Sequence, residues 1–166
     1  RQMCIRDSDN AWNSLVEMDS YGHDVEAGWL LCEAARVLED RQLMDRANRL
    51  ALDVTDACLV EGLSDKGYMM YEKKGGKTTG HASWWGQIET MIACVNAWQI
   101  SGNDVYLQSA DTVWTFVKDC MIDREYGEWY SDCFDGEPKK DTPKVSMWRC
   151  PYHTVRLGVE IHNRLK

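Results

Sequence analysis

Apolar residues recur every three or four positions in five stretches of the chain, which is the spacing of amphipathic α-helices. The first two stretches, residues 23–39 and 42–60, are separated by only a few residues, so we expect an antiparallel helical hairpin. Residues 83–99 and 105–121 repeat this arrangement. A fifth helix is expected from Pro151 to the end of the chain, because proline suits the first turn of a helix.

The connections between these helices are of two kinds. In the short linker 100–104, Gly102 is expected to end one helix and Asp104 to cap the next. The connections 62–80 and 123–149 are much longer, and each contains a strand-like run, at 67–71 and 128–131 respectively. Long structured loops in compact domains are usually functional, so these two loops are candidates for carrying part of a site.

Helical hairpins with tight turns at one end and long loops at the other are typical of an all-α toroid. No repeat of the tetratricopeptide or HEAT kind is visible, which disfavours a solenoid. Two and a half hairpins cannot close a toroid, so we expect this chain to be part of a larger barrel. Residues 1–8 (RQMCIRDS) follow no helical or strand period and are interpreted as a non-native leader, which leaves 9–166 as the C-terminal part of one catalytic domain.

Composition and charge exclude several classes of protein. The net charge of −8 and the scattered basic residues argue against a nucleic-acid partner. No apolar run is long enough to span a bilayer and no signal peptide is apparent, so a membrane role is not expected. The seven cysteines are odd in number and contain no CxxC pair, which predicts free thiols in the cytoplasm and disfavours a zinc site.

The aromatic residues are unusual, with eight Trp and seven Tyr against two Phe. Trp and Tyr suit stacking against sugar rings, although large helical cores use them as well. We assign Trp29, Trp98 and Trp114 to the core on the basis of their helical spacing.

Polar and aromatic residues cluster where the first, third and fifth helices begin, at 21–26, 84–89 and 148–153. Alternate helices of an up-and-down array run in the same direction. The three clusters should therefore meet at one rim of the molecule. Convergence of two histidines, two carboxylates and several tryptophans at one place predicts a site for chemistry.

His23 and His153 are the candidate catalytic residues at this rim. The positive end of a helix dipole favours neutral imidazole, the form that acts as a general base. Two histidines on opposite sides of a carbon atom could remove a proton from one face and return it to the other, which an epimerase requires. Glu26 shares the helical face of His23 and could orient its ring or bind a sugar hydroxyl.

Each of these residues also has a purely structural interpretation. A histidine at a helix start is often a cap or a packing residue, and Asp24 could be the cap of the first helix. Trp84 and Trp85 could belong to the core. His81 and His162 are expected to have no catalytic role.

Four segments of the chain resemble successive C-terminal motifs of the N-acylglucosamine 2-epimerase family. They are YGHDVEAGWLLCEAA, WWGQIETMIACVNAW, YGEWY and KVSMWRCPYHTVRLGVEI. The form WRCPYH is most similar to the cellobiose 2-epimerase branch, and the resemblance runs from about Leu15 to the end of the chain. It implies an (α/α)6 barrel, of which this chain carries less than half, and it implies neither a metal ion nor an organic cofactor.

The resemblance also implies a reaction. A β-linked disaccharide of the cellobiose type opens its reducing-end glucose ring, and C2 is inverted to give mannose through a cis-enediolate. His153 matches the histidine that abstracts the C2 proton, and His23 matches the histidine that returns it. The residues implied to bind the sugar are Glu26, Trp85, Glu89 and Trp148. The sequence around Gly86 departs from the common motif and leaves the choice of disaccharide or monosaccharide open.

Other functions remain open. An N-acylglucosamine 2-epimerase or a mannose isomerase would have the same fold and similar histidines. An (α/α) glycoside hydrolase would need two opposed carboxylates, such as Asp24 or Glu26 with Glu89, but it leaves both histidines unexplained. A non-catalytic helical module would not need histidines at helix starts. We expect the chain alone to be inactive and poorly stable, because half a toroid exposes apolar faces.

Overall fold

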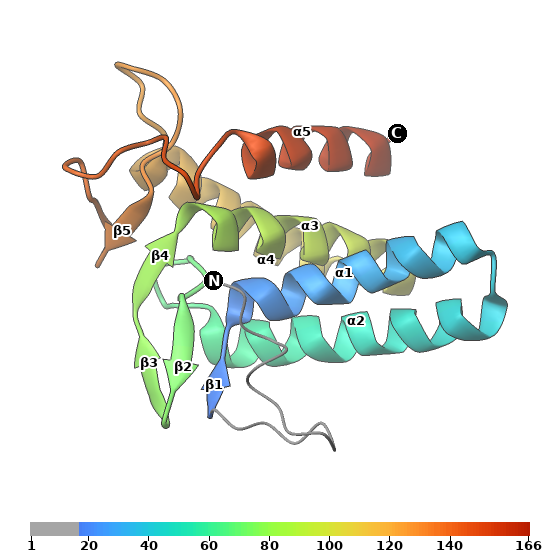
Figure 1. Ribbon diagram of the computed structural model, residues 1–166. Coiled ribbons are helices and arrows are strands. Elements are labelled where there is room, and N and C mark those ends of the chain that lie inside the picture. The colour runs from blue at the N-terminus through green and yellow to red at the C-terminus, as the bar shows by residue number, and fades with distance from the viewer. Residues whose placement is uncertain (1–16) are drawn as a thin grey trace.

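The computed structural model describes residues 17–166, and within that range it contains the five predicted helices in the predicted order (Figure 1). They are α1 (Tyr21–Leu38), α2 (Arg41–Gly62), α3 (Trp84–Ser101), α4 (Val105–Phe116) and α5 (Tyr152–Arg164). The chain continues from α4 into a π-helical segment, Val117–Met121, so the predicted helix 105–121 ends in a π turn. The predicted leader and the start of the predicted domain lie outside the described residues.

The turn between α1 and α2 is built from two local signals. Glu39 adopts the left-handed conformation, with φ of 54°, and ends α1. The Asp40 carboxylate accepts hydrogen bonds from the backbone N–H groups of Gln42 and Leu43, at 2.9 and 3.0 Å, and so caps α2. The two helices therefore run antiparallel as the predicted hairpin.

The turn between α3 and α4 differs from the prediction in its cap. Gly102, with φ of 70°, ends α3 as expected. The prediction for Asp104 is wrong, because its carboxylate accepts a hydrogen bond from the Trp98 indole N–H at 3.1 Å and caps nothing. The side chain of Asn103 accepts from the Val105 N–H instead, at 3.2 Å.

Helix α3 is the centre of the fold, and α1, α4 and α5 pack around it (Figure 1). Residues 86–97 of α3 are all buried, which explains why this helix is apolar nearly all round. Trp29 of α1 is a core residue, as predicted, and is 2 % exposed. Trp98 is only half-buried. Trp114 is 36 % exposed and lines a groove between α4 and α5, so its assignment to the core is wrong.

Strands from the two long loops form two small antiparallel sheets, one of which also includes a short strand before α1. One sheet contains β1 (Met18–Asp19), β2 (Glu72–Lys74) and β3 (Lys77–Thr79). The other contains β4 (His81–Ser83), β5 (Asp132–Phe134) and β6 (Glu137–Pro138). Figure 1 shows both sheets at the end of the molecule where α1, α3 and α5 begin.

The strands lie beside the predicted strand-like runs, not within them. Met69 and Trp129, in the two runs, each form one isolated bridge and are buried in the core, so their apolar character reflects burial. The actual hairpins turn at two-residue loops with positive φ, at 75–76 (Gly-Gly) and 135–136 (Asp-Gly). These dipeptides are the usual sequences of type I′ hairpin turns.

Helix α5 is attached differently from the others. None of its residues is fully buried, and it lies along α3 at the edge of the molecule (Figure 1). Grooves run along its flanks, one of them lined by Trp114, Leu157 and Ile161. No helix in residues 17–166 is long and apolar enough to cross a membrane.

Candidate active site

The starts of α1, α3 and α5 meet around one indole. The Trp85 ring lies 4.5 Å from the His23 ring and 6.1 Å from the His153 ring, measured between centroids. The three polar and aromatic clusters therefore converge as the alternation of helix direction predicted. Two imidazoles that are 130 residues apart in sequence thus both lie near a single indole.

Glycine at position 22 allows this arrangement. A Cβ atom at Gly22 would lie 2.6 Å from the Trp85 indole and 3.1 Å from the Gly86 Cα atom. The Trp85 indole of α3 can thus pack against the backbone of α1 because residue 22 has no side chain. The edge of the Trp85 ring also meets Tyr71, with centroids 6.3 Å apart, which fixes the indole from the loop side.

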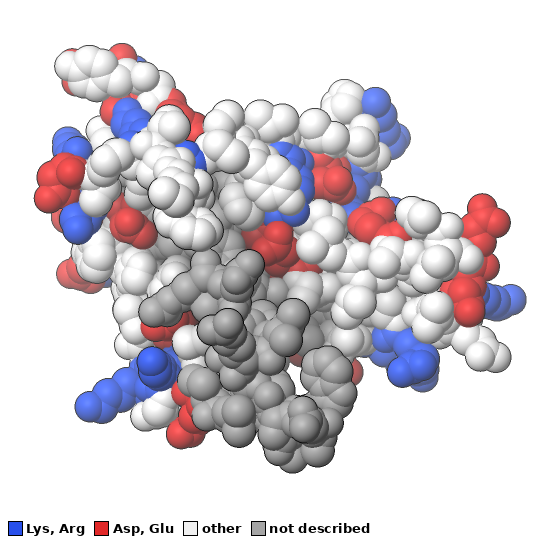
Figure 2. All heavy atoms as spheres, viewed as in Figure 1, with Lys and Arg blue, Asp and Glu red and all other residues white. Residues whose placement is uncertain are grey.

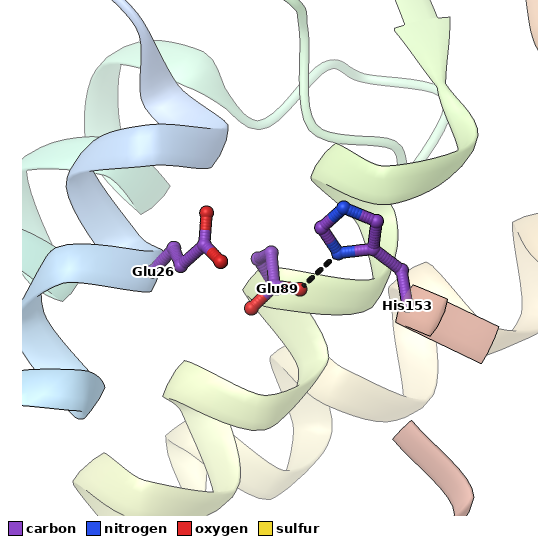
Figure 3. Close-up of side chains that lie close together, drawn as sticks. All are labelled: Glu26, Glu89 and His153. Carbon is purple, nitrogen blue, oxygen red and sulfur yellow. Dashed lines mark hydrogen bonds and ion pairs between the residues drawn. The ribbon is translucent and has the colours of Figure 1, made fainter. Parts of the chain in front are cut away.

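His153 is held by a carboxylate from the neighbouring helix. Its Nδ1 atom lies 2.7 Å from Glu89 Oε1 (Figure 3). Since a carboxylate only accepts, Nδ1 carries the proton and donates it, which leaves the Nε2 lone pair available for proton abstraction. The half-buried ring thus has the tautomer that a general base needs.

Glu89 is completely buried and makes three polar contacts. It accepts hydrogen bonds from the Trp29 indole at 3.0 Å, from His153 and from the guanidinium of Arg156. With 0 % of its surface exposed, Glu89 has all of these contacts inside the protein. Glu89 thus positions the histidine, and its contact with sugar stays a prediction.

Arg156 is a central residue of the site that the sequence analysis did not identify. Its guanidinium donates to Glu89 of α3 and to Glu26 of α1, and so joins three helices. It also lies 3.2 Å from His153 Nδ1, a contact between two protonated nitrogens. Its position three residues after His153, on the same helical face, was the signal that could have found it.

Glu26, Glu89 and His153 point toward one another from three helices (Figure 3). One potential metal-ligand atom from each lies within 4.8 Å of the other two. The Arg156 guanidinium contacts both carboxylates, however, so the cation that neutralises this cluster belongs to the protein itself. A metal ion would have to displace that guanidinium to bind both carboxylates.

The sequence pattern of the N-acylglucosamine 2-epimerase (GlcNAc 2-epimerase) family matches residues 8–156. A cellobiose 2-epimerase of Bacteroides fragilis is 40 % identical over 158 residues, which cover 92 % of this chain and 40 % of that protein. The chain belongs to the N-acylglucosamine 2-epimerase family. It spans about 40 % of the length of the curated cellobiose 2-epimerases that it matches.

Solved structures agree with this family. A sugar epimerase from a ruminal bacterium superposes with a TM-score of 0.89 at 35 % identity, covering 94 % of this chain and 40 % of that one. A D-mannose isomerase has a TM-score of 0.75 at 22 % identity and shares the fold alone, covering 87 % of this chain and 37 % of that one. The five helices of this family member are part of an (α/α)6 barrel, as predicted.

The environment of His23 differs from the prediction. Its Nδ1 atom is 2.7 Å from the Ser20 hydroxyl, a residue just before α1. Glu26 is turned away toward Arg156, so it does not orient the His23 ring. His23 is exposed apart from its contact with Trp85, which leaves it open to a ligand.

Trp148 stands apart from this cluster. It is 77 % exposed, and no ring contact joins it to another aromatic residue in the described part of the chain. Its backbone N–H donates to the Ser146 hydroxyl at 3.2 Å, which holds it in a tight turn before α5. The structure therefore brings His23, Trp85 and His153 together but leaves Trp148 at the surface.

His81 supports the rim without reaching it. Its ring is stacked between Tyr71 and Phe134, with centroids 4.6 and 5.0 Å away. Burial lowers the pKa of His81, against the opposing effect of nearby Asp132.

On the face shown in Figure 2, Lys and Arg form small separate groups among acidic and uncharged residues.

Proposed function

We propose that the complete protein inverts C2 of a reducing-end sugar by proton transfer between two histidines. The observation that carries this proposal is the placement of His23 and His153 around Trp85, with Nε2 of His153 left free by Glu89. A sugar stacked on the indole would have an imidazole within reach of each face of C2.

In the proposed reaction the sugar ring opens and the aldehyde makes the C2 proton acidic. His153 Nε2 takes that proton, and the electrons of the C–H bond form a cis-enediolate. The resulting imidazolium is stabilised by its hydrogen bond to Glu89, which Arg156 and Trp29 hold in place. His23 then gives a proton to the opposite face of C2, and the two histidines exchange roles in the reverse direction.

We propose a β-linked disaccharide of the cellobiose type as substrate, with glucose converted to mannose at its reducing end. The similarity to cellobiose 2-epimerases supports this choice. The exposed indole of Trp148 would hold the second sugar, since it stands beside the start of α5 and is free to stack. Glu26, which is half-buried, would accept a hydrogen bond from a sugar hydroxyl beside its contact with Arg156.

A mannose isomerase is the second candidate, because the same histidines could move the carbonyl to C2 and a solved isomerase shares the fold. A glycoside hydrolase fits less well. Glu26 and Glu89 contact the same guanidinium and do not face each other across an open cleft.

The cytoplasm is the proposed compartment, since the six cysteines in the described range are free thiols.

The test uses this chain joined to the N-terminal part of the Bacteroides fragilis relative, which we call the full-length chimera. It is incubated with cellobiose and EDTA in D2O, and the sugars are analysed by NMR. We expect glucosyl-mannose with deuterium at C2, and at least a hundredfold loss of rate in His23→Ala and in His153→Ala. The chain alone is expected to be inactive.

Each other product contradicts a specific part of the proposal. A ketose would identify an isomerase, and glucose release would identify a hydrolase. If N-acetylglucosamine were converted and cellobiose were not, the substrate class would be wrong. Full activity in both histidine variants would refute the mechanism.

A further inference from the structure

Arg149 is the one fully buried residue between position 134 and the end of the chain at 166. It is 3 % exposed, whereas its neighbours Trp148 and Cys150 are exposed. A guanidinium is costly to bury, so its burial requires strong contacts. The segment that carries His153 is thus fixed to the rest of the molecule by a charged anchor just before α5.

The guanidinium has three contacts that suit its planar, forked shape. Nη1 donates to the Ser131 hydroxyl at 2.5 Å, and Nη2 donates to the Trp129 carbonyl. Its carbon atom lies 4.8 Å from the centre of the Trp84 ring, which is the position of a cation–π contact. Two hydrogen bonds and one stacking contact define both the place and the orientation of the side chain.

The backbone transmits this anchoring to both sides of Arg149. Arg149 and Ser146 exchange backbone hydrogen bonds of 2.9 and 3.1 Å, which close the turn that contains Trp148. On the other side, Pro151 follows after one residue and α5 begins at Tyr152. The exposed indole and the catalytic candidate His153 therefore lie within four residues of one buried anchor.

A side-chain path reaches His153 as well. The Trp84 ring that stacks on Arg149 also meets the His153 ring edge to face, with centroids 6.2 Å apart. The backbone N–H of Trp84 donates to the Ser131 carbonyl at 2.9 Å, so Trp84 and Ser131 form one unit. Arg149 locks the start of α5 against this unit.

We propose that Arg149 is a positioning residue that sets where His153 and Trp148 stand relative to Trp85. This rests on the proposed function, since it assigns those two residues to substrate. Without the guanidinium, the segment before α5 has no buried side chain to hold it. His153 then keeps its chemistry but loses its fixed distance to Glu89 and to the sugar, and Trp148 loses its fixed orientation.

The test compares Arg149→Met, Arg149→Lys and Ser131→Ala in the full-length chimera. In Arg149→Met we expect kcat to fall at least tenfold and KM for cellobiose to rise several-fold. Arg149→Lys keeps the charge but loses the two-pronged guanidinium, so its kcat and KM should lie between those of Arg149→Met and wild type. Ser131→Ala loses one hydrogen bond and should also give intermediate values. Arg124→Met is the matched control, because Arg124 is exposed in the same loop and, among the described residues, donates to the Lys118 carbonyl alone.

A second readout does not depend on turnover. In protein labelled with ¹⁵N-histidine, the His153 signals should report one fixed tautomer in wild type and an average of two in Arg149→Met. Unchanged His153 signals with unchanged kcat and KM would overturn the proposal. Reduced folding yield with normal kinetics in Arg149→Lys and Ser131→Ala would overturn it too, because it would indicate a purely structural role.

The outcomes for Arg149 and for the proposed function are separable. A wild-type chimera that converts none of the sugars would refute the proposed function, and the His153 signals would still decide whether Arg149 positions that ring. An active wild type with no response to the Arg149 and Ser131 variants would refute the positioning role alone.

Discussion

Helices α3 and α5 each supply one half of the Glu89–His153 pair, but they are held in the molecule by opposite means. Helix α3 has an unbroken buried stretch at 86–97, whereas no residue of α5 is fully buried. The first is fixed by apolar packing on several sides. The second is fixed by directed polar contacts, so a change in either helix should damage the site in a different way.

Arginine side chains supply the polar contacts that hold α5 in place. Arg156 and Arg164 both lie over the ring of Trp29, at 5.2 and 5.8 Å from its centre. Arg164 also donates to the side chains of Asn96 and Gln99 of α3, at 3.0 and 2.9 Å. Such contacts specify geometry strongly, while their net contribution to stability is small because the charges must be desolvated. Apolar packing of α3 therefore supplies stability, whereas the arginines of α5 fix the position of that helix.

The largest expected effect comes from Glu89→Gln, which alters the link between the two helices. The amide keeps the shape of the side chain but cannot stabilise an imidazolium at His153 or balance Arg156 as a carboxylate does. We expect kcat of the full-length chimera to fall by about 10²-fold or more, as in the loss of other acid–base groups. Steady-state kinetics on cellobiose measures this.

Glu125→Gln is the control for this change, because Glu125 is exposed in the loop after α4. It should keep wild-type kinetics. A Glu89→Gln variant with normal kcat would show that the buried carboxylate does not support His153, and the contrast between the helices would then concern stability alone.

The second-largest expected effect is a difference between α3 and α5 in the free energy of unfolding lost when an isoleucine is truncated. Ile92 of α3 is 0 % exposed, while Ile161 of α5 lines an open groove. Truncation of a buried isoleucine costs about 2–5 kcal/mol, because it removes apolar burial and leaves a cavity. We expect that cost for Ile92→Ala and about 1 kcal/mol or less for the partly exposed Ile161→Ala, measured by urea unfolding of the full-length chimera. Equal costs would mean that α5 is as firmly packed as α3.

Periodicity was sufficient to predict the helices and the rim. Helical spacing of the apolar residues predicted the five helices, and the common direction of alternate helices predicted the convergence of His23, Trp85 and His153. These features depend on local sequence and on chain topology, both of which can be read along the chain. The strand positions are not predicted correctly, because Met69 and Trp129 are apolar residues of the buried core and not of a strand. The Gly-Gly and Asp-Gly dipeptides at the hairpin turns are the signal that indicates the correct positions.

The polar contacts of the site could not be predicted in the same way. The contact of Arg156 with Glu26 joins residues 130 positions apart. The spacing of Arg156 from His153 places it on the same helical face but does not indicate which carboxylate it contacts. Glu26 had two possible roles by its spacing, to orient the His23 ring or to bind a sugar hydroxyl. The ring contacts Ser20 instead, and the Glu26 side chain contacts Arg156. Side-chain pairing across helices depends on packing that sequence spacing alone does not determine.

The smallest expected effect concerns Asp123, which anchors the loop that leads to α5. Its carboxylate is 5 % exposed, accepts backbone N–H bonds from Glu125 and Tyr126 at 2.9 and 3.1 Å, and pairs with Lys144. Lys144 holds the pKa of Asp123 well below its usual range. A depressed pKa stabilises the fold above the ordinary aspartate value of about 3.9, and that stabilisation is lost as the pH falls toward the folded-state value.

Lys144→Met removes the main cause of the depressed pKa and should lower the melting temperature of the full-length chimera at pH 7. The difference from wild type should begin to shrink below about pH 4, where the unfolded wild-type chain takes up a proton at Asp123 that the folded chain does not. Melting curves between pH 7 and 3 measure this. A difference that stayed constant with pH would mean that Lys144 acts through its contacts with the Tyr130 ring and the Gly127 carbonyl. In that case the Lys144 charge would anchor the loop without Asp123, through partners that do not titrate between pH 3 and 7.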